Sequence, residues 1–187
     1  MAVSRSRKLS RAAILRRLAR IQLFALDVDG VLTDGGVYYT DDGLQLRKFN
    51  VRDGVGMQSV QAAGVVLALV TASNAPAIRH RAKVLGVNHV FIGVEDKLGV
   101  VTALCGDLGI GLDRVAYVGD DINDAGVLGA VGAPMTVADA APQAKAAAAY
   151  VTERNGGAGA VREICELLLT ARRSRTARAP RAKPGKN

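Results

Sequence analysis

Two acidic clusters, each directly after an apolar run, contain the residues of this chain best suited to chemistry. Asp27 and Asp29 follow the run at 23–26, and three aspartates within 120–124 follow the run at 115–118. Carboxylates this close repel one another unless a cation lies between them, although solvated acids in a turn are the simpler alternative for the first pair. Oxygen ligands suit Mg²⁺, which takes few ligands from protein and the rest from water and phosphate. The clusters therefore predict a magnesium site.

The apolar runs themselves predict the elements that position these acids. Residues 23–26, 65–70 and 115–118 are apolar without alternation, as in parallel strands covered on both faces. The carboxyl ends of such strands meet at one edge of the sheet, where ligands bind in open α/β folds. The expected fold is α/β and Rossmann-like, with three layers and a mostly parallel central sheet. Further strands are predicted at 88–92, 131–137 and 150–152, and helices at 53–63, 75–85, 97–108, 140–147 and 160–171.

A short polar segment follows the second apolar run. Thr71, Ala72 and Ser73 come directly after 65–70. A hydroxyl group and backbone N–H groups at the end of a strand are suited to holding phosphate oxygens. Because a threonine after a strand is common, this segment gains its meaning from the acidic clusters around it.

A β-hairpin is predicted at 36–49, since strand-forming residues flank the turn signal Asp42-Gly43. Between Thr33 and the helix expected near residue 53 there is no room for a second domain over the site. The predicted site is therefore open to water and to large substrates, unless another copy of the chain covers it.

The basic charge of the chain belongs to its ends. Residues 1–21 and 172–187 each hold seven Lys or Arg and no acid, whereas 22–171 carries 11 basic and 17 acidic residues, a net charge of −6. The expected organisation is a basic extension at 1–20, one domain at 21–171 and a basic, disordered tail at 172–187. The extension resembles a transit peptide in composition, or an arm that binds nucleic acid or a membrane surface. The favoured alternatives are a solvated basic extension and a short helix packed on the domain.

Cysteine usage and hydropathy limit the location of the protein. Cys105 and Cys165 lie in apolar helical surroundings and are expected to be reduced core thiols, which suits a cytoplasmic protein. No apolar run approaches the length of a membrane span, so no membrane association is expected.

The segment DVDGVLT at 27–33 resembles the first motif of the haloacid dehalogenase superfamily. The resemblance implies that Asp27 is the nucleophile that attacks phosphorus and that Asp29 is the general acid and base. It also implies phosphate binding by Thr71, Ala72 and Lys97, the lysine neutralising the charge of the assembly. A lone lysine would otherwise be read as a solvated surface cation.

The acidic cluster at 120–124 matches the fourth motif of this superfamily. The resemblance makes Asp120 a direct ligand of Mg²⁺, together with Asp27 and the backbone carbonyl of Asp29. Asp121 and Asp124 are placed behind these ligands.

Within the superfamily, residues 21–171 resemble the uncapped branch that removes phosphate from Kdo 8-phosphate, a 2-keto-3-deoxy sugar acid, and from sialic-acid-type 9-phosphates. The matching segments are DVDGVLTDG at 27–35, FNVRDG at 49–54, YVGDD at 117–121, YVT at 150–152 and GGAGAVRE at 156–163. The resemblance implies a magnesium-dependent sugar-acid phosphatase that forms an aspartyl phosphate. It also implies a homotetramer in which C-terminal segments cover neighbouring active sites. For the glycine-rich loop at 156–159, a flexible hinge is the alternative to such a cover.

The chain departs from this branch after the second strand. The branch usually carries Thr-Gly-Arg there, whereas this chain has Thr71-Ala72-Ser73. The missing arginine is a candidate for binding the substrate carboxylate, because arginine pairs with carboxylates through two hydrogen bonds and serine cannot. Arg52 is the candidate that compensates for it, and a structural role is its alternative.

Two non-enzymatic functions compete with the phosphatase. A nucleic-acid-associated protein is disfavoured because the chain has no helix-turn-helix signal, no aromatic platforms, and its basic residues lie in the tails. A catalytically idle assembly subunit is disfavoured because the five motif residues are all present: Asp27, Asp29, Thr71, Lys97 and Asp120.

Overall fold

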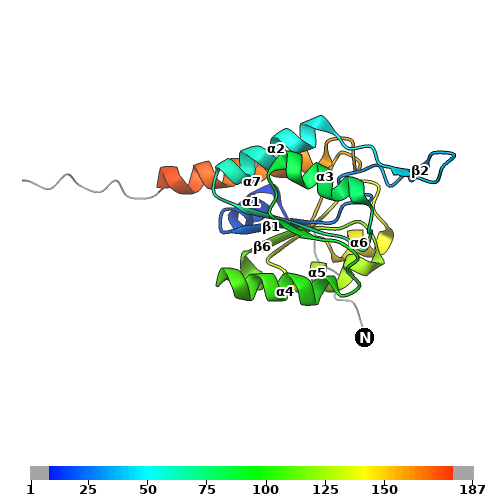
Figure 1. The fold of residues 1–187 in the computed structure, drawn as a ribbon. Coiled ribbons are helices and arrows are strands. Elements are labelled where there is room, and N and C mark those ends of the chain that lie inside the picture. The colour runs from blue at the N-terminus through cyan, green and yellow to red at the C-terminus, as the bar shows by residue number, and fades with distance from the viewer. Residues whose placement is uncertain (1–8, 179–187) are drawn as a thin grey trace, which may run out of the picture.

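A six-stranded parallel sheet in the order β5-β4-β1-β6-β7-β8 forms the centre of the protein (Figure 1). This computed structural model describes residues 9–178. The strands are β1 (Leu23–Leu26), β4 (Val66–Val70), β5 (His89–Phe91), β6 (Val115–Val118), β7 (Ala133–Thr136) and β8 (Tyr150–Val151). Every residue of β1 and β6 is buried, as their unbroken apolar sequences predict. The predicted three-layer α/β architecture is confirmed.

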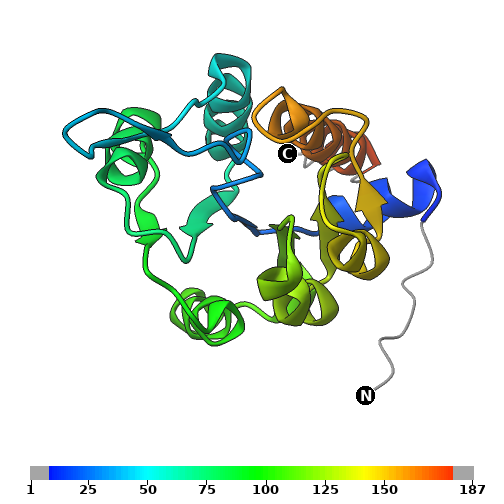
Figure 2. The same cartoon turned by 90° about the vertical axis from the view of Figure 1, so that its right-hand side faces the viewer.

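Helices cover both faces of the sheet (Figures 1 and 2). One layer contains α1 (Arg11–Leu18), α2 (Val51–Ala62), α3 (Pro76–Leu85) and α7 (Ala160–Arg178). The other contains α4 (Lys97–Leu108), α5 (Ala125–Ala130) and α6 (Pro142–Ala147). Short 3-10 helices lie at Leu112–Arg114 and Ile122–Asp124. No helix within residues 9–178 combines the length and the apolar character needed to cross a bilayer.

The hairpin consists of β2 (Tyr38–Tyr39) and β3 (Gln45–Leu46), and it projects away from the body of the protein (Figure 1). A bridge between Thr33 and Phe49 closes its base. No second domain stands between this base and α2, so the prediction of a short flap in place of a cap is confirmed. The four strand residues of the hairpin are all exposed.

The two terminal helices lie side by side on the same face of the domain (Figures 1 and 2). Ile14 and Leu18 of α1 are fully buried, so part of the expected N-terminal extension is a packed short helix, one of the two favoured alternatives. The helix predicted to end at 171 continues to Arg178, so the prediction of disorder is wrong for residues 172–178. Its Arg- and Ala-rich sequence has good helix propensity and no proline before Pro180. The predicted tail residues 179–187 lie outside the described residues.

The start of α2 also differs from the prediction. The helix begins at Val51 rather than near residue 53, because the side chain of Asn50 accepts a hydrogen bond from the backbone N–H of Arg52. Asparagine is a favoured residue at this capping position. The consequence for the site is that Asn50, at the boundary between hairpin and helix, is held in a fixed conformation.

Candidate active site

The loops that follow β1 and β6 bring the two acidic clusters together. Asp27 comes directly after β1, and its N–H donates to the carbonyl of Val118 at the end of β6, at 2.9 Å. Carboxylate oxygens of Asp27, Asp120 and Asp124 lie within 4.8 Å of one another. The carboxylates that follow β1 and β6 therefore meet at one edge of the sheet, as expected.

Lys97 is the first residue of α4, and its side chain is buried between these acids. Its Nζ is 2.5 Å from Oδ2 of Asp27 and 2.7 Å from Oδ1 of Asp124. Burial opposes the charged ammonium, but Asp27 and Asp124 outweigh this effect and raise the pKa of Lys97. Asp96 fixes the start of the helix because its side chain accepts from the N–H of Gly99 at 2.9 Å. Lys97 is therefore a buried cation and not a solvated surface lysine.

Asp124 is fully occupied by contacts within the protein. Its Oδ1 accepts from Lys97 and, at 2.6 Å, from the hydroxyl of Tyr117, while its Oδ2 accepts from the N–H groups of Asp120 at 2.9 Å and Asp121 at 3.3 Å. Although its oxygens lie close enough to share a metal with Asp27 and Asp120, both already have partners. Its expected place behind the metal ligands stays a prediction.

Tyr117 was not among the predicted site residues. It lies in β6 and is fully buried, and burial together with Asp124 raises the pKa of its hydroxyl, which stays a donor. A signal existed in the sequence: Tyr117 is the single residue of the run 115–118 that carries a polar group. A buried tyrosine hydroxyl usually has a hydrogen-bond partner, and here the partner is Asp124.

The site holds more negative charge than its lysine can balance. Burial and the neighbouring Asp124 raise the pKa of Asp27 to about 6 despite Lys97. Burial, Asp27 and Asp124 raise the pKa of Asp120 to about 7. These carboxylates favour an added cation, and because they offer only oxygen the donor set fits Mg²⁺.

Gly30 leaves space for Asp120. It has φ of +79°, and a Cβ at this position would lie 2.0 Å from Oδ2 of Asp120. A side chain would therefore be strained by the backbone and would collide with the carboxylate. The glycine of the first motif is needed for the two acidic clusters to approach each other.

Asp121 lies apart from the carboxylate cluster. It is exposed, and its Oδ1 accepts from the N–H of Ile122 at 2.7 Å, which caps the 3-10 helix Ile122–Asp124. Its charge adds a small contribution to the raised pKa of Asp120, after burial and the effects of Asp27 and Asp124. The described contacts give Asp121 a capping role.

The segment expected to bind phosphate lies at the same edge of the sheet. β4 pairs with β1 in parallel, with Leu69 beside Leu26, so Thr71 follows at the level of the first motif. Thr71 is buried, and its Oγ1 accepts from the N–H of Ser73 at 3.2 Å, whereas Ala72 between them is exposed. The loop thus presents the backbone of Ala72 at the surface.

Arg47 was not among the predicted site residues. It links the hairpin to the loops that follow β1 and β4. Its Nε is 2.8 Å from Oδ1 of Asp29, and its Nη2 is 3.2 Å from Oδ2 of Asp29 and 2.9 Å from Oγ of Ser73. The alternation expected in the hairpin carried a signal: with Leu44 and Leu46 on one face, Gln45 and Arg47 lie on the other. Asp29 is thereby held by an arginine and not by Lys97.

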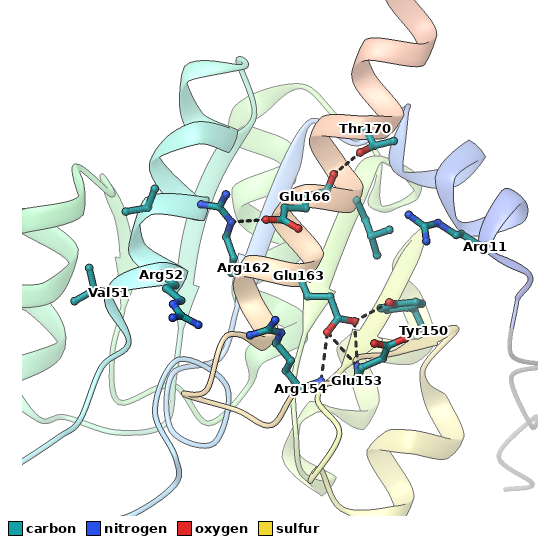
Figure 3. A pocket seen from close by; sticks show the side chains of 12 residues that line it. Arg11, Val51, Arg52, Tyr150, Glu153, Arg154, Arg162, Glu163, Glu166 and Thr170 are labelled. Carbon is teal, nitrogen blue, oxygen red and sulfur yellow. Dashed lines mark hydrogen bonds and ion pairs between the residues drawn. The ribbon is translucent and has the colours of Figure 1, made fainter.

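Arg52 does not join the carboxylate cluster. It lines a cavity of about 670 Å³ beside α1, α2 and α7, together with Arg154 and Arg162, and none of the predicted catalytic or metal residues lines this cavity (Figure 3). The neighbouring Asp53 accepts from the N–H of Arg162 at 2.7 Å and holds the first turn of α7. Within one chain, the expectation that Arg52 compensates for Ser73 is not supported.

The glycine-rich loop at 156–159 supports the loop that follows β1 and carries the first motif, within the same chain. Gly157 donates its N–H to the carbonyl of Val31 at 3.0 Å and accepts from the side chain of Asn50 at 3.2 Å. A Cβ at Gly156 would lie 1.8 Å from the carbonyl oxygen of Gly30. The structure gives this loop an internal supporting role, which neither the hinge nor the cover interpretation included.

Comparisons with known proteins agree with this geometry. Residues 95–164 match the family model for haloacid dehalogenase-like hydrolases. The chain is 41% identical to the 3-deoxy-D-manno-octulosonate 8-phosphate phosphatase KdsC of Yersinia pestis, over 84% of each chain. It is 42% identical to KdsC of Escherichia coli K12, over 86% of this chain and 85% of the relative.

Solved structures give the same result. The Moraxella catarrhalis phosphatase, crystallised with magnesium, phosphate and KDO, has a TM-score of 0.85 at 39% identity and covers 88% of this chain and 95% of its own. The cobalt-bound phosphatase of Haemophilus influenzae has a TM-score of 0.81 at 33% identity, covering 88% of this chain and 96% of its own. The chain therefore belongs to the KdsC phosphatase family of the haloacid dehalogenase-like hydrolases.

Proposed function

We propose that this protein is a magnesium-dependent phosphatase that hydrolyses Kdo 8-phosphate, a phosphorylated 2-keto-3-deoxy sugar acid. The observation that carries the proposal is the buried cluster in which Lys97 contacts Asp27 and Asp124, next to Asp120. A fold has little reason to keep three carboxylates around one ammonium, because the like charges raise the free energy of the folded state. The identities to KdsC relatives over most of both chains support the substrate class.

The chemistry begins with attack on phosphorus by the carboxylate of Asp27. The bond between phosphorus and the sugar oxygen breaks, and this oxygen takes a proton from Asp29, leaving an aspartyl phosphate. Asp29 then accepts a proton from a water molecule whose oxygen attacks phosphorus, and the bond to Asp27 breaks. Phosphate and the free sugar acid are the products.

Other residues hold the phosphate group during these steps. The ammonium of Lys97 offsets negative charge beside Asp27. The backbone around Ala72 and the hydroxyl of Thr71 are positioned at the same strand edge to donate to phosphate oxygens. The placement of these residues around Asp27 supports these roles.

Mg²⁺ would be held by the carboxylates of Asp27 and Asp120 and by the backbone carbonyl of Asp29. When bound, the ion supplies positive charge that offsets the carboxylates and the phosphate oxygens. Asp124 stays behind these ligands, since both of its oxygens accept hydrogen bonds from the protein.

The experiment that tests the proposal is a phosphate-release screen with and without magnesium. The substrates are Kdo 8-phosphate, a sialic-acid-type 9-phosphate and neutral sugar phosphates. We expect magnesium-dependent release that is fastest with Kdo 8-phosphate. Faster release from the 9-phosphate would reassign the substrate, and no release from any ester would refute the phosphatase function.

We also propose that the protein is a homotetramer joined through its hairpins. Apolar side chains on the hairpin face opposite Gln45 and Arg47 are exposed, with 48% of Tyr38 and 54% of Leu46 accessible. Two strands alone are marginally stable, and exposed apolar patches of this kind mark interfaces. Multi-angle light scattering should give four times the chain mass, and Leu46→Ser should lower it.

A cytoplasmic location completes the proposal. Cys105 and Cys165 are both free and buried, as expected for reduced core thiols. Fractionation of cells followed by immunodetection should find the protein with cytoplasmic markers, and recovery in the membrane fraction would contradict it.

A further inference from the structure

The guanidinium group of Arg47 is bonded on all three of its nitrogens. Nε and Nη2 each donate a hydrogen bond to one of the two carboxylate oxygens of Asp29. Nη2 also donates to Oγ of Ser73 at 2.9 Å, and Nη1 donates to the side chain of Gln45 at 3.1 Å. Only 4% of the Arg47 side chain is exposed, compared with 34% of Asp29. The arginine is therefore positioned by contacts from the hairpin and from the loop after β4.

A cavity of about 580 Å³ lies beside this ion pair, between the hairpin and the loop after β4. Arg47 is the one charged residue among the described residues that line it, while Gln45, Ser73 and Asn74 add polar groups. Val37, Tyr39 and Leu44 supply apolar surface. Because Asp29 must reach the oxygen that leaves phosphorus, the adjoining cavity is in position to take the rest of the substrate.

We propose that Arg47 determines specificity by binding a carboxylate on the leaving group of the substrate. This inference rests on the proposed phosphatase function and names the residue that selects its substrate class. Arginine matches the geometry of a carboxylate through two parallel hydrogen bonds. The incoming carboxylate takes the place of Asp29 in this fork, and both oxygens of Asp29 become free to face the reacting phosphate ester.

The exchange keeps the guanidinium paired, because one carboxylate replaces another. A buried guanidinium left without a partner would cost several hydrogen bonds, which a neutral sugar could not fully restore. Neither nearby lysine lines this cavity: Lys48 pairs with Asp34 at 3.0 Å, and Lys97 is buried in the carboxylate cluster. Selection of a sugar acid over a neutral sugar follows from this single residue.

The test compares two substrates with three variants of the full-length enzyme in magnesium. Kdo 8-phosphate carries a carboxylate, and a pentose 5-phosphate does not. For Arg47→Met, kcat/KM with Kdo 8-phosphate should fall about tenfold to a hundredfold more than with the pentose 5-phosphate, mainly through KM, because a charge-assisted pair is lost. Arg47→Lys should recover part of the preference. Arg20→Met, which removes an exposed ion pair with Asp113, is the matched control and should leave both rates unchanged.

A measurement on the wild-type enzyme keeps the test independent of the folding of the variants. Free Kdo should inhibit turnover of the pentose 5-phosphate, and its methyl ester should inhibit at least tenfold more weakly, because it lacks the charge that pairs with Arg47. Equal inhibition by acid and ester, or an intact preference for Kdo 8-phosphate in Arg47→Met, would overturn the inference about Arg47. Either result would leave the proposed phosphatase function unaffected. A wild-type enzyme without preference for carboxylated substrates would overturn the proposed function as well.

Discussion

Replacing Asp120 by asparagine should stabilise the protein when no metal is present. Burial, Asp27 and Asp124 raise the pKa of Asp120 from 3.8 to about 7, so the folded protein holds this charge at a cost. In the pH range from about 4 to about 7 the folded state binds a proton that the unfolded state has released, and stability falls as pH rises. Above about pH 7 the cost is fully present. Asparagine keeps the shape of the carboxylic acid and carries no charge.

The size of the effect follows from the difference between the two pKa values. At about 1.4 kcal/mol for each pH unit, the difference corresponds to about 4 kcal/mol, which we halve to about 2 kcal/mol because Asp120 is partly exposed to screening solvent. For a domain of this size, the increase in Tm at pH 8 should be about 4 to 8 °C. At pH 5 most of the gain should be absent.

The assay is thermal unfolding followed by circular dichroism in EDTA at pH 5, 6.5 and 8. Asp121→Asn is the matched control, because this exposed neighbour lies outside the carboxylate cluster and asparagine can still cap the N–H of Ile122. Added magnesium should raise the Tm of the wild-type protein at pH 8 and should have little effect on Asp120→Asn. A Tm for Asp120→Asn below that of wild type at pH 8, or an equal gain at pH 5 and pH 8, would refute the reasoning.

Four further outcomes are expected. Asp27→Asn should lower phosphate release more than about a thousandfold while circular dichroism shows an intact fold, because an amide is a poor nucleophile; retained turnover would remove Asp27 from this role. Asp29→Asn should slow turnover strongly yet preserve magnesium affinity in calorimetry, since the backbone carbonyl remains. An equal loss of turnover and of magnesium affinity would contradict the assignment of proton transfer to the side chain and metal binding to the carbonyl. Exhaustive chelation should abolish phosphate release and magnesium should restore it, whereas activity that survives chelation would exclude the metal site. Gly156→Ala should lower both Tm and kcat, because its Cβ would collide with the carbonyl of Gly30. The free energy of unfolding should fall by about 1 to 3 kcal/mol. Gly106→Ala, where a Cβ meets nothing within 4 Å, is its control.

The sequence allowed the sheet and the carboxylate cluster to be predicted because both depend on local patterns. A buried parallel strand is an unbroken apolar run, and the residues that follow β1, β4 and β6 must meet at one edge. Contacts that cross between distant segments had no such pattern. The pairing of Arg47 with Asp29 depends on the angle at which the hairpin leaves the domain, which its residues do not specify.

The end of the domain shows a second limit. The high charge of residues 172–178 suggested disorder, but arginine and alanine are also strong helix formers, and α7 continues through them. Arg172 donates to the carbonyl of Ile21 at 3.2 Å and ties this part of the helix to the segment just before β1. Composition alone could not separate a solvated tail from the last turns of a packed helix.

The support of the first-motif loop by the glycine-rich loop affects how the enzyme matures during synthesis. The bond between Asn50 and Gly157 spans 107 residues of the chain. Domains emerge from the ribosome N-terminal end first, and contacts between segments this distant form slowly. A nascent chain that ends before Gly156 already holds Asp27, Lys97 and Asp120, but it lacks the glycine-rich loop that packs against Gly30. Catalytic competence therefore arrives only with the last part of the domain to be translated.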